Sequence, residues 1–174
     1  MKVLVINGSP HLNGCTDRAL REVEAALTAQ GVAVERVNVG HRDVRGCIGC
    51  NTCGERGRCV FDDLVNETAP KFAEADGIVI GSPVYYAGAN GQLLAFLDRL
   101  FYSTSGAFDK AMKVGAAVVS SRRAGSTSAF DGINKYYHQR HAHRFEHLLE
   151  RGARVYGGRR RSRPRGAPDD AQPR

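Results

Sequence analysis

Four of the five cysteines lie close together in the sequence, with the spacing Cys47-x2-Cys50-x2-Cys53-x5-Cys59. Gaps of two residues let the first three thiolates converge on one point, and a fourth ligand a few residues later completes an all-cysteine site. Three glycines in the same stretch give the backbone the freedom to wrap a bulky group. The pattern indicates a 4Fe–4S cluster held by these four residues.

Two other chemistries fit the cysteines less well. Structural zinc sites usually use two separated pairs of ligands, whereas these cysteines form one compact run. Disulfides are not expected in a reducing compartment.

A second segment with chemical potential is Gly8-Ser-Pro-His-Leu-Asn-Gly-Cys-Thr16, which joins an expected strand to an expected helix. Backbone N–H groups and the helix dipole at such a junction favour an anion. No lysine follows Gly14, so this is not a Walker A loop, and the G-x-G-x-x-G dinucleotide fingerprint is absent. The segment predicts a site for a monophosphate, and the alternative is an ordinary polar turn before a capped helix.

Two more polar segments follow expected strands. In Ser82-Pro-Val-Tyr-Tyr-Ala-Gly-Ala-Asn-Gly91, adjacent tyrosines can flank a flat heterocycle, or they can simply close the core. In Ser120-Ser-Arg-Arg-Ala-Gly-Ser-Thr127, backbone amides and arginines can donate to carbonyl oxygens or to a reduced, anionic ring. The alternative for this segment is a solvated basic loop.

The elements that must position these segments alternate along the chain. Short β-branched runs predict strands over 2–6, 32–39, 77–81 and 113–120. Apolar residues at helical spacing predict helices over 16–30, 62–75, 91–102 and 126–137. Such alternation predicts an α/β fold with a parallel sheet covered on both faces, and such sheets bind ligands at the carboxyl ends of their strands.

Together the three loop segments resemble one family. GSPHLNGCT resembles the GSPR-x-x-GNT phosphate loop of NAD(P)H-dependent FMN reductases and iron–sulfur flavoproteins. SPVYYAGANGQLLAFLDRLF and SSRRAGSTSAFDGINKYY resemble the flavin-ring loop and the third flavin loop of that family. The matches run in order from residue 2 to about residue 137. The resemblance implies a flavodoxin-like, doubly wound parallel sheet with strand order 2-1-3-4. We expect the fifth strand of the family to be missing from this chain.

The resemblance also assigns the cofactor contacts. It implies that the FMN phosphate is held by Ser9, His11, Asn13, Gly14, Cys15 and Thr16. It implies that the ring is lined by Pro83, Val84, Tyr85, Tyr86 and Gly88. It implies that the far side is closed by Ser121, Arg122, Arg123 and Gly125. Cys15 departs from the pattern, because the family often has asparagine at this position. The backbone N–H of Cys15 can still donate to the phosphate.

The cysteine motif is similar to that of iron–sulfur flavoproteins, but also to CIGC-x-x-C segments of FMN reductases that hold no cluster. Structural or redox-sensitive cysteines are therefore the alternative to a cluster.

The activity that the resemblance implies is that of an FMN-dependent oxidoreductase. NAD(P)H is the expected reductant, or ferredoxin if the cluster is present, and the acceptor is a flavin, a quinone or another small molecule. FMN carries the electron chemistry, so no side chain is named as catalytic. The alternatives are a flavodoxin-type electron carrier and a non-functional remnant. The family suggests a homodimer or homotetramer.

The net charge of +7 is unevenly distributed. Residues 1–137 contain 15 Lys and Arg against 14 Asp and Glu, whereas residues 138–174 contain ten Arg, no Lys and four acids. The body therefore gives no electrostatic sign of a nucleic-acid partner. No apolar run reaches the ~20 residues that cross a bilayer, and the first apolar run is too short for a signal peptide, so we expect a cytoplasmic protein without a membrane partner.

The composition changes abruptly after Tyr137. Arginine replaces lysine, and proline, glycine and arginine crowd residues 157–168. With permissible codons, reading His141 to Arg154 one base later gives Met-Pro-Ile-Val-Ser-Ser-Thr-Tyr-Trp-Asn-Glu-Val-His-Gly, which resembles the fifth strand and following loop of the family. We therefore expect a domain over 1–137 and an atypical, partly disordered tail over 138–174, with a reading-frame slip near Tyr136–Tyr137. A remnant impaired by this tail is the non-functional alternative.

Overall fold

A computed structural model describes residues 1–138 of the chain. The elements follow one another in this order: β1 (Lys2–Asn7), α1 (Cys15–Ala29), β2 (Ala33–Asn38), α2 (Thr52–Arg56), α3 (Leu64–Glu74), β3 (Gly77–Tyr85), β4 (Gly88–Ala89), α4 (Gly91–Ser103), β5 (Val114–Ser120) and α5 (Ser126–His138). The predictions of a reading-frame slip and of an Arg-rich, partly disordered tail concern residues that lie, almost entirely, outside the described part. They stay predictions, as does the division of the chain at residue 137.

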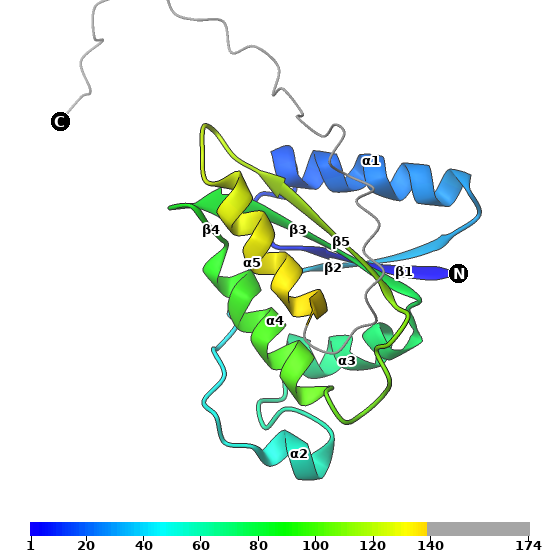
Figure 1. The fold of residues 1–174 in the computed structure, drawn as a ribbon, viewed down its shortest axis with the longest axis vertical. Helices are drawn as coiled ribbons and strands as arrows, with labels where there is room; N and C mark the ends of the chain where they lie inside the picture. Colours follow the sequence, from blue (N-terminus) through cyan, green and yellow to red (C-terminus); the bar gives the residue numbers. More distant parts are fainter. Residues whose placement is uncertain (139–174) are drawn as a thin grey trace, which may run out of the picture.

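Four strands form a parallel sheet in the order β2-β1-β3-β5 (Figure 1). The strand at 114–120 is the one that the sequence places fourth, so the parallel order matches the prediction of a doubly wound sheet. Helix α1 covers one face, and α3, α4 and α5 cover the other (Figure 1). Because all four strands are parallel, the segments after β1, β3 and β5 leave the sheet at the same edge.

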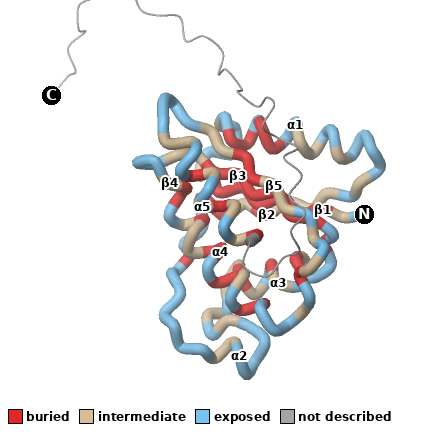
Figure 2. The backbone as a smooth tube through the Cα atoms, viewed as in Figure 1, coloured by how far each residue is buried: buried red, intermediate tan, exposed pale blue. Residues whose placement is uncertain are grey.

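The two-residue period of β1 explains how one strand serves both layers. Val3 and Val5 face α1, whereas Leu4 and Ile6 belong to the larger core under α3, α4 and α5. The central strands are buried along most of their length (Figure 2). A strand buried on both faces reads as a continuous apolar run, and this is why the sequence signal for β1 is strong.

A fifth strand corrects the expectation of four. Strand β4 has only two residues and pairs antiparallel with the end of β3, after a tight turn at Tyr86 and Ala87. Both turn residues have left-handed backbones, with φ of 48° and 60°. Two consecutive left-handed residues form a type I′ turn, which is the type that two-residue hairpins favour. Its usual sequence signal is Asn-Gly. Tyr-Ala carries no such signal, so the sequence did not predict the hairpin.

Helix α2 was also missed. It has five residues, none of them buried, and lies inside the cysteine-rich segment, to which the sequence analysis assigns no helix. A helix this short shows no apolar periodicity, which is the signal that identified the other helices.

Within residues 1–138, β5 pairs only with β3, so no parallel strand follows it in the described part of the chain.

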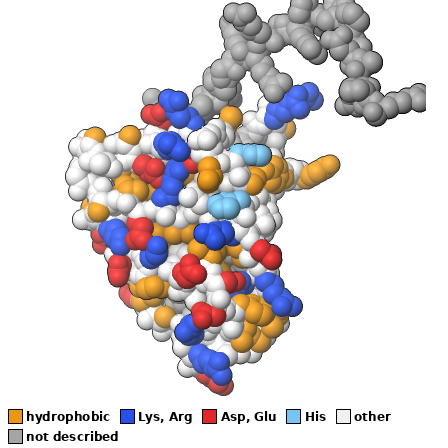
Figure 3. Space-filling view, turned by 180° about the vertical axis from the view of Figure 1, so that it is seen from behind, with side chains coloured by type: hydrophobic (Ala, Val, Ile, Leu, Met, Phe, Trp, Pro, Cys, Tyr) orange, Lys and Arg blue, Asp and Glu red, His pale blue; other side chains and the backbone are white. Residues whose placement is uncertain are grey.

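No helix in that part is both long and apolar enough to cross a membrane. On the face shown in Figure 3, basic and acidic side chains are interspersed.

The close approach of β3 to α1 gives a first test. A methyl group on Gly81 would lie 2.5 Å from a Leu20 methyl carbon, and Leu20 is fully buried. We expect Gly81→Ala to lower the free energy of unfolding by about 1–3 kcal/mol through overpacking. Gly132→Ala in α5, where nothing lies within 4 Å of the added carbon, should raise it by up to about 1 kcal/mol. Urea denaturation measures both, and equal effects would contradict the packing described here.

Candidate functional site

The segment between β1 and α1 is a turn whose backbone is fixed by its own hydrogen bonds. The Asn7 side chain accepts the Ser9 N–H at 3.0 Å, and the Ser9 hydroxyl accepts the His11 N–H at 3.1 Å. The Gly14 N–H then donates to the His11 carbonyl at 3.1 Å. Ser9 is buried, whereas His11 and Asn13 are exposed. These hydrogen bonds fix the shape of the turn.

No side chain caps the N-terminus of α1. The N-cap residue is Gly14, which has an extended backbone and no side chain with which to accept an N–H from the first turn. The first N–H groups of a helix have no partner within the helix, so an uncapped first turn attracts an anion. The helix therefore lacks the side-chain cap that the alternative expected, and the phosphate site stays a prediction.

An acidic residue in this first turn is neutralised by two arginines. Asp17 is almost fully buried and accepts hydrogen bonds from Arg21 at 2.8 Å and from Arg36 at 2.6 Å. Arg36 also pairs with Glu24 at 2.6 Å. A buried carboxylate would repel an anion at the same helix end, and the two guanidinium groups offset that repulsion.

The segments after β1 and β2 contact each other through their backbones, and the segment after β1 also bonds to β3. The Gly8 N–H donates to the Gly81 carbonyl at 2.7 Å. A methyl group on Gly40, just after β2, would lie 2.3 Å from both the Gly8 oxygen and the Ser9 carbonyl carbon. Gly40 thus supports the β1–α1 turn from behind, a role that the sequence did not reveal.

The hairpin after β3 is held at both ends. The Ser82 hydroxyl accepts the Asn90 N–H at 2.9 Å, and the Asn90 side chain caps α4 by accepting the Leu93 N–H at 3.0 Å. Tyr85 is about half exposed, and Tyr86 at the tip is fully exposed. The two rings therefore do not close the core, and the alternative proposed for them is wrong.

The segment after β5 touches both of the others. The Thr16 and Ser120 hydroxyls are 2.6 Å apart, which joins this segment to the start of α1. Gly125 has a φ of 85°, and a methyl group on it would lie 2.6 Å from the Ala87 backbone in the hairpin tip. Ser121, Arg122 and Arg123 are exposed between these two contacts. The three segments singled out by the sequence thus converge at one edge of the sheet.

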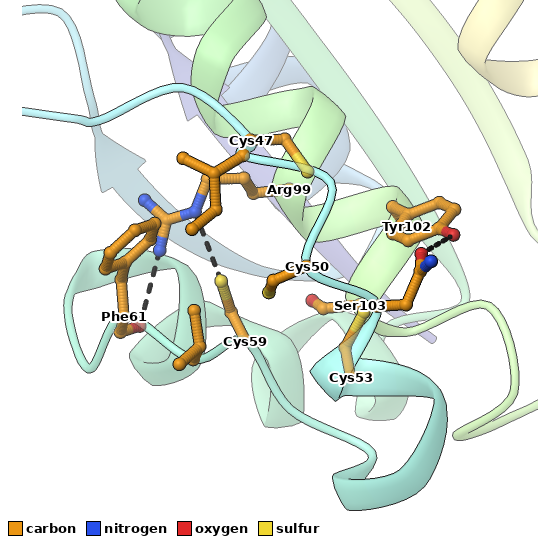
Figure 4. Close-up of a pocket in the computed structure, with 11 residues that line it drawn as sticks. Cys47, Cys50, Cys53, Cys59, Phe61, Arg99, Tyr102 and Ser103 are labelled. Atoms are coloured by element: carbon orange, nitrogen blue, oxygen red, sulfur yellow. Dashed lines mark hydrogen bonds between the residues drawn. The ribbon is translucent and has the colours of Figure 1, made fainter.

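The four cysteines of the motif line a single pocket at the other end of α4 (Figure 4). The pocket contains about 320 Å³ of empty space, part of it continuous with solvent. Cys47 and Cys50 are exposed, and Cys53 and Cys59 are partly buried. Within residues 1–138, no three His, Cys, Asp or Glu side chains stand close enough together to bind a single metal ion.

Burial raises the pKa of the Cys53 thiol, and negative charge on the other three cysteines raises it further. In contrast, hydrogen bonds from the side chain and backbone of Thr52 lower the pKa of Cys50. Nearby negative charge thus adds to burial in disfavouring ionisation of the Cys53 thiol.

Arg99 of α4 organises one wall of this pocket. Its side chain is almost fully buried and makes a two-pronged ion pair with Asp63, at 2.7 and 2.9 Å. It also donates to the carbonyls of Arg45 at 3.1 Å and Phe61 at 3.3 Å, and its Nε donates to Cys59 Sγ at 3.3 Å (Figure 4). No pattern in the sequence indicates this role, because a lone arginine in an amphipathic helix usually faces solvent.

The comparisons with known proteins agree with the family that the sequence resembles. A family model described as NADPH-dependent FMN reductase matches residues 1–146. An iron–sulfur flavoprotein of Methanocaldococcus jannaschii is 38% identical over 139 residues, which cover 79% of this chain and 72% of that protein. An iron–sulfur flavoprotein of Methanosarcina thermophila is 30% identical over 140 residues, covering 79% of this chain and 73% of that protein.

The fold is also shared with solved structures. The crystal structure of RosB with a bound derivative of riboflavin 5′-phosphate superimposes with a TM-score of 0.63 at 16% identity. The match covers 81% of this chain but 60% of the RosB chain, so this chain spans less than two thirds of that relative.

The Arg99–Asp63 pair generates the second prediction. Asp63→Ala leaves a buried guanidinium unpaired and removes the cap of α3, where Asp63 accepts the Val65 N–H at 3.0 Å. We expect a loss of about 3–5 kcal/mol in the free energy of unfolding. The matched control is Asp62→Ala, whose ion pair with Arg58 is exposed and worth less than about 1 kcal/mol. Urea denaturation separates the two, and a small loss in Asp63→Ala would contradict the structural role of the pair.

Proposed function

The chain belongs to the family of NADPH-dependent FMN reductases and iron–sulfur flavoproteins, and from this premise we propose that it is an FMN-dependent oxidoreductase. In this proposal it takes electrons from NAD(P)H, or from ferredoxin through a 4Fe–4S cluster, and passes them to a flavin, a quinone or another small acceptor. The observation that carries the proposal is the convergence of three strand-end segments beside an uncapped helix.

The phosphate of FMN fits the turn before α1. Ser9, His11, Asn13, Gly14, Cys15 and Thr16 are the residues proposed to hold it. The first-turn N–H groups of α1 are the principal donors, which is why the site needs no lysine. Thr16 has a buried hydroxyl already shared with Ser120, so it contributes to the shape of the site as well as to binding.

The proposed position of the ring is beside the hairpin and the segment after β5. Pro83, Val84, Tyr85, Tyr86 and Gly88 are the residues proposed to line one side. Ser121, Arg122, Arg123 and Gly125 are proposed to close the other. The exposed tyrosine rings offer flat apolar surface, and the exposed arginines offer cationic donors to a ring that becomes negative on reduction. FMN itself supplies the one- and two-electron chemistry.

The cysteine pocket fits an iron–sulfur cluster. Cys47, Cys50, Cys53 and Cys59 are the proposed ligands, and all four line the same pocket. A four-iron cluster is wider than a single ion, so its ligands stand further apart than those of a zinc ion, whose Zn–S bonds are about 2.3 Å. The kinship with iron–sulfur flavoproteins supports a cluster over the arrangement of cluster-free FMN reductases.

Flavin binding gives the third prediction. We expect the protein to quench FMN fluorescence saturably and to bind FMN more tightly than riboflavin, which lacks the phosphate. Gly40→Ala forces its methyl group against the Gly8 and Ser9 backbone, so it should weaken FMN binding about tenfold or more, which is about 1.4 kcal/mol. Riboflavin binding should weaken less.

The matched control for Gly40→Ala is Gly46→Ala, which has no atom within 4 Å of the added carbon and should leave FMN binding unchanged. Equal affinity for FMN and riboflavin in the unaltered protein would contradict the proposed phosphate site.

Turnover gives the fourth prediction and separates an enzyme from an electron carrier. We expect the FMN-loaded protein to oxidise NADPH or NADH continuously when free flavin or a quinone is supplied in excess. A flavodoxin-type carrier has no site for the nicotinamide, so it would leave the reductant unconsumed while still accepting electrons from dithionite. Absorbance of the reduced nicotinamide measures the difference. FMN binding without any such turnover would overturn the enzyme and favour the carrier.

A further inference from the structure

We propose that Arg99 is a positioning residue for the iron–sulfur cluster, and that its hydrogen bond to Cys59 raises the reduction potential of that cluster. The inference rests on the proposed function, because it requires the cluster to be present. It goes beyond that function by naming a residue that is not a ligand and by giving it a measurable electronic role.

The direction of the Arg99 side chain is fixed by all of its other contacts. Its two terminal nitrogens are occupied by Asp63 and by the carbonyls of Arg45 and Phe61. The remaining donor, Nε, lies 3.3 Å from Cys59 Sγ. The guanidinium carbon also lies 5.1 Å from the centre of the Phe61 ring. Among these hydrogen bonds of Arg99, Nε has the sulfur as its single acceptor, whereas each terminal nitrogen has two other acceptors.

The contacts also connect Arg99 to both ends of the cysteine-rich segment. Arg45 comes two residues before Cys47, and Phe61 comes two residues after Cys59. By binding both carbonyls, one side chain of α4 brings the two ends of the loop together around the pocket. Cys59 is held further by Asn66, which accepts its N–H at 2.9 Å and donates to its carbonyl at 3.0 Å. The backbone of Cys59 is thus fixed beside Arg99, whose Nε bonds to its sulfur.

A hydrogen bond to a ligand sulfur changes the reduction potential through charge. An added electron increases the negative charge on the sulfurs, so an N–H donor stabilises the reduced form more than the oxidised form. Hydrogen bonds from charged donors are the stronger kind. Because Asp63 balances the charge of Arg99, the local N–H donor carries most of the effect, and the direction of the shift is upward.

The test compares two variants of Arg99 with a control in the full-length protein, purified and reconstituted anaerobically with iron and sulfide. Arg99→Lys keeps the charge and loses the Nε donor, and Arg99→Met removes both. The control is Tyr102→Phe, one turn further along α4, because the Tyr102 side chain also lines the pocket but donates to Asn51 at 2.8 Å rather than to a sulfur. The readouts are iron and sulfide content and a redox titration followed by electron paramagnetic resonance.

We expect both Arg99 variants to titrate at a lower potential than the unaltered protein. At the midpoint potential of the unaltered protein, the ratio of reduced to oxidised cluster in each variant should fall about fivefold or more, the effect of losing a hydrogen bond worth about 1 kcal/mol. Tyr102→Phe should keep the original midpoint. Unchanged midpoints in Arg99 variants that carry a full cluster overturn this inference and leave the proposed function intact.

A measurement on the unaltered protein covers the case in which the variants do not fold. Growth with ¹⁵N-arginine and pulsed magnetic resonance on the reduced cluster should reveal a nitrogen coupled to the unpaired electron. Absence of that coupling in protein that holds the cluster overturns the inference. Protein that binds no iron and sulfide overturns the cluster, and the inference with it, while FMN binding still tests the rest of the proposed function separately.

Discussion

The guanidinium of Arg99 lies inside the protein, where an unpaired cation would cost several kcal/mol of lost hydration. The chain meets that cost with Asp63 and with carbonyl oxygens drawn from the cysteine-rich segment. A segment with one five-residue helix and no extensive core of its own is thereby tied to α4 through a buried charge. Arg99 therefore links the cysteines to α4, and Cys59 also packs against the main core.

Helix α4 connects this interaction to the other candidate site. Its N-terminus is fixed by Asn90, whose backbone is held by Ser82 of β3, so the helix starts at the hairpin. Arg99 follows eight residues after Gly91, about 12 Å along the helix axis. The same rigid element thus begins at the proposed flavin site and ends at the cysteine pocket. Its buried leucines and phenylalanine anchor it against the sheet between the two sites.

The sequence predicted the parts of the structure that follow from periodicity and from strand ends. All four parallel strands and the four longer helices lie within a few residues of the predicted ranges, except that β3 continues to Tyr85. The convergence of three loops follows from parallel topology alone. The hairpin at Tyr86 and Ala87 could not be predicted, because its turn type is set by tertiary contacts such as that between Gly125 and Ala87.

Residues that support the sites from behind were equally invisible in the sequence. Gly40 matters because two backbones meet there, whereas a single glycine after a strand is just as typical of an ordinary turn. The role of Arg99 depends on partners 36 to 54 residues away in the chain. Short-range patterns indicate the residues that face a ligand, since those cluster in loops, but contacts between distant segments form only once the chain is folded.

Both candidate sites use directed N–H donors to stabilise negative charge, and neither site includes a lysine among residues 1–138. At the turn before α1, backbone N–H groups face the proposed phosphate site, and Arg21 and Arg36 are paired with Asp17, whose charge they offset. At the cysteine pocket, the sulfur of Cys59 accepts a hydrogen bond from Arg99, whose charge is balanced by Asp63. In both places a directed N–H takes the role that a mobile cation has elsewhere. Fixed donors cost no reorganisation when the charge of a bound cofactor changes, which suits a protein that gains and loses electrons.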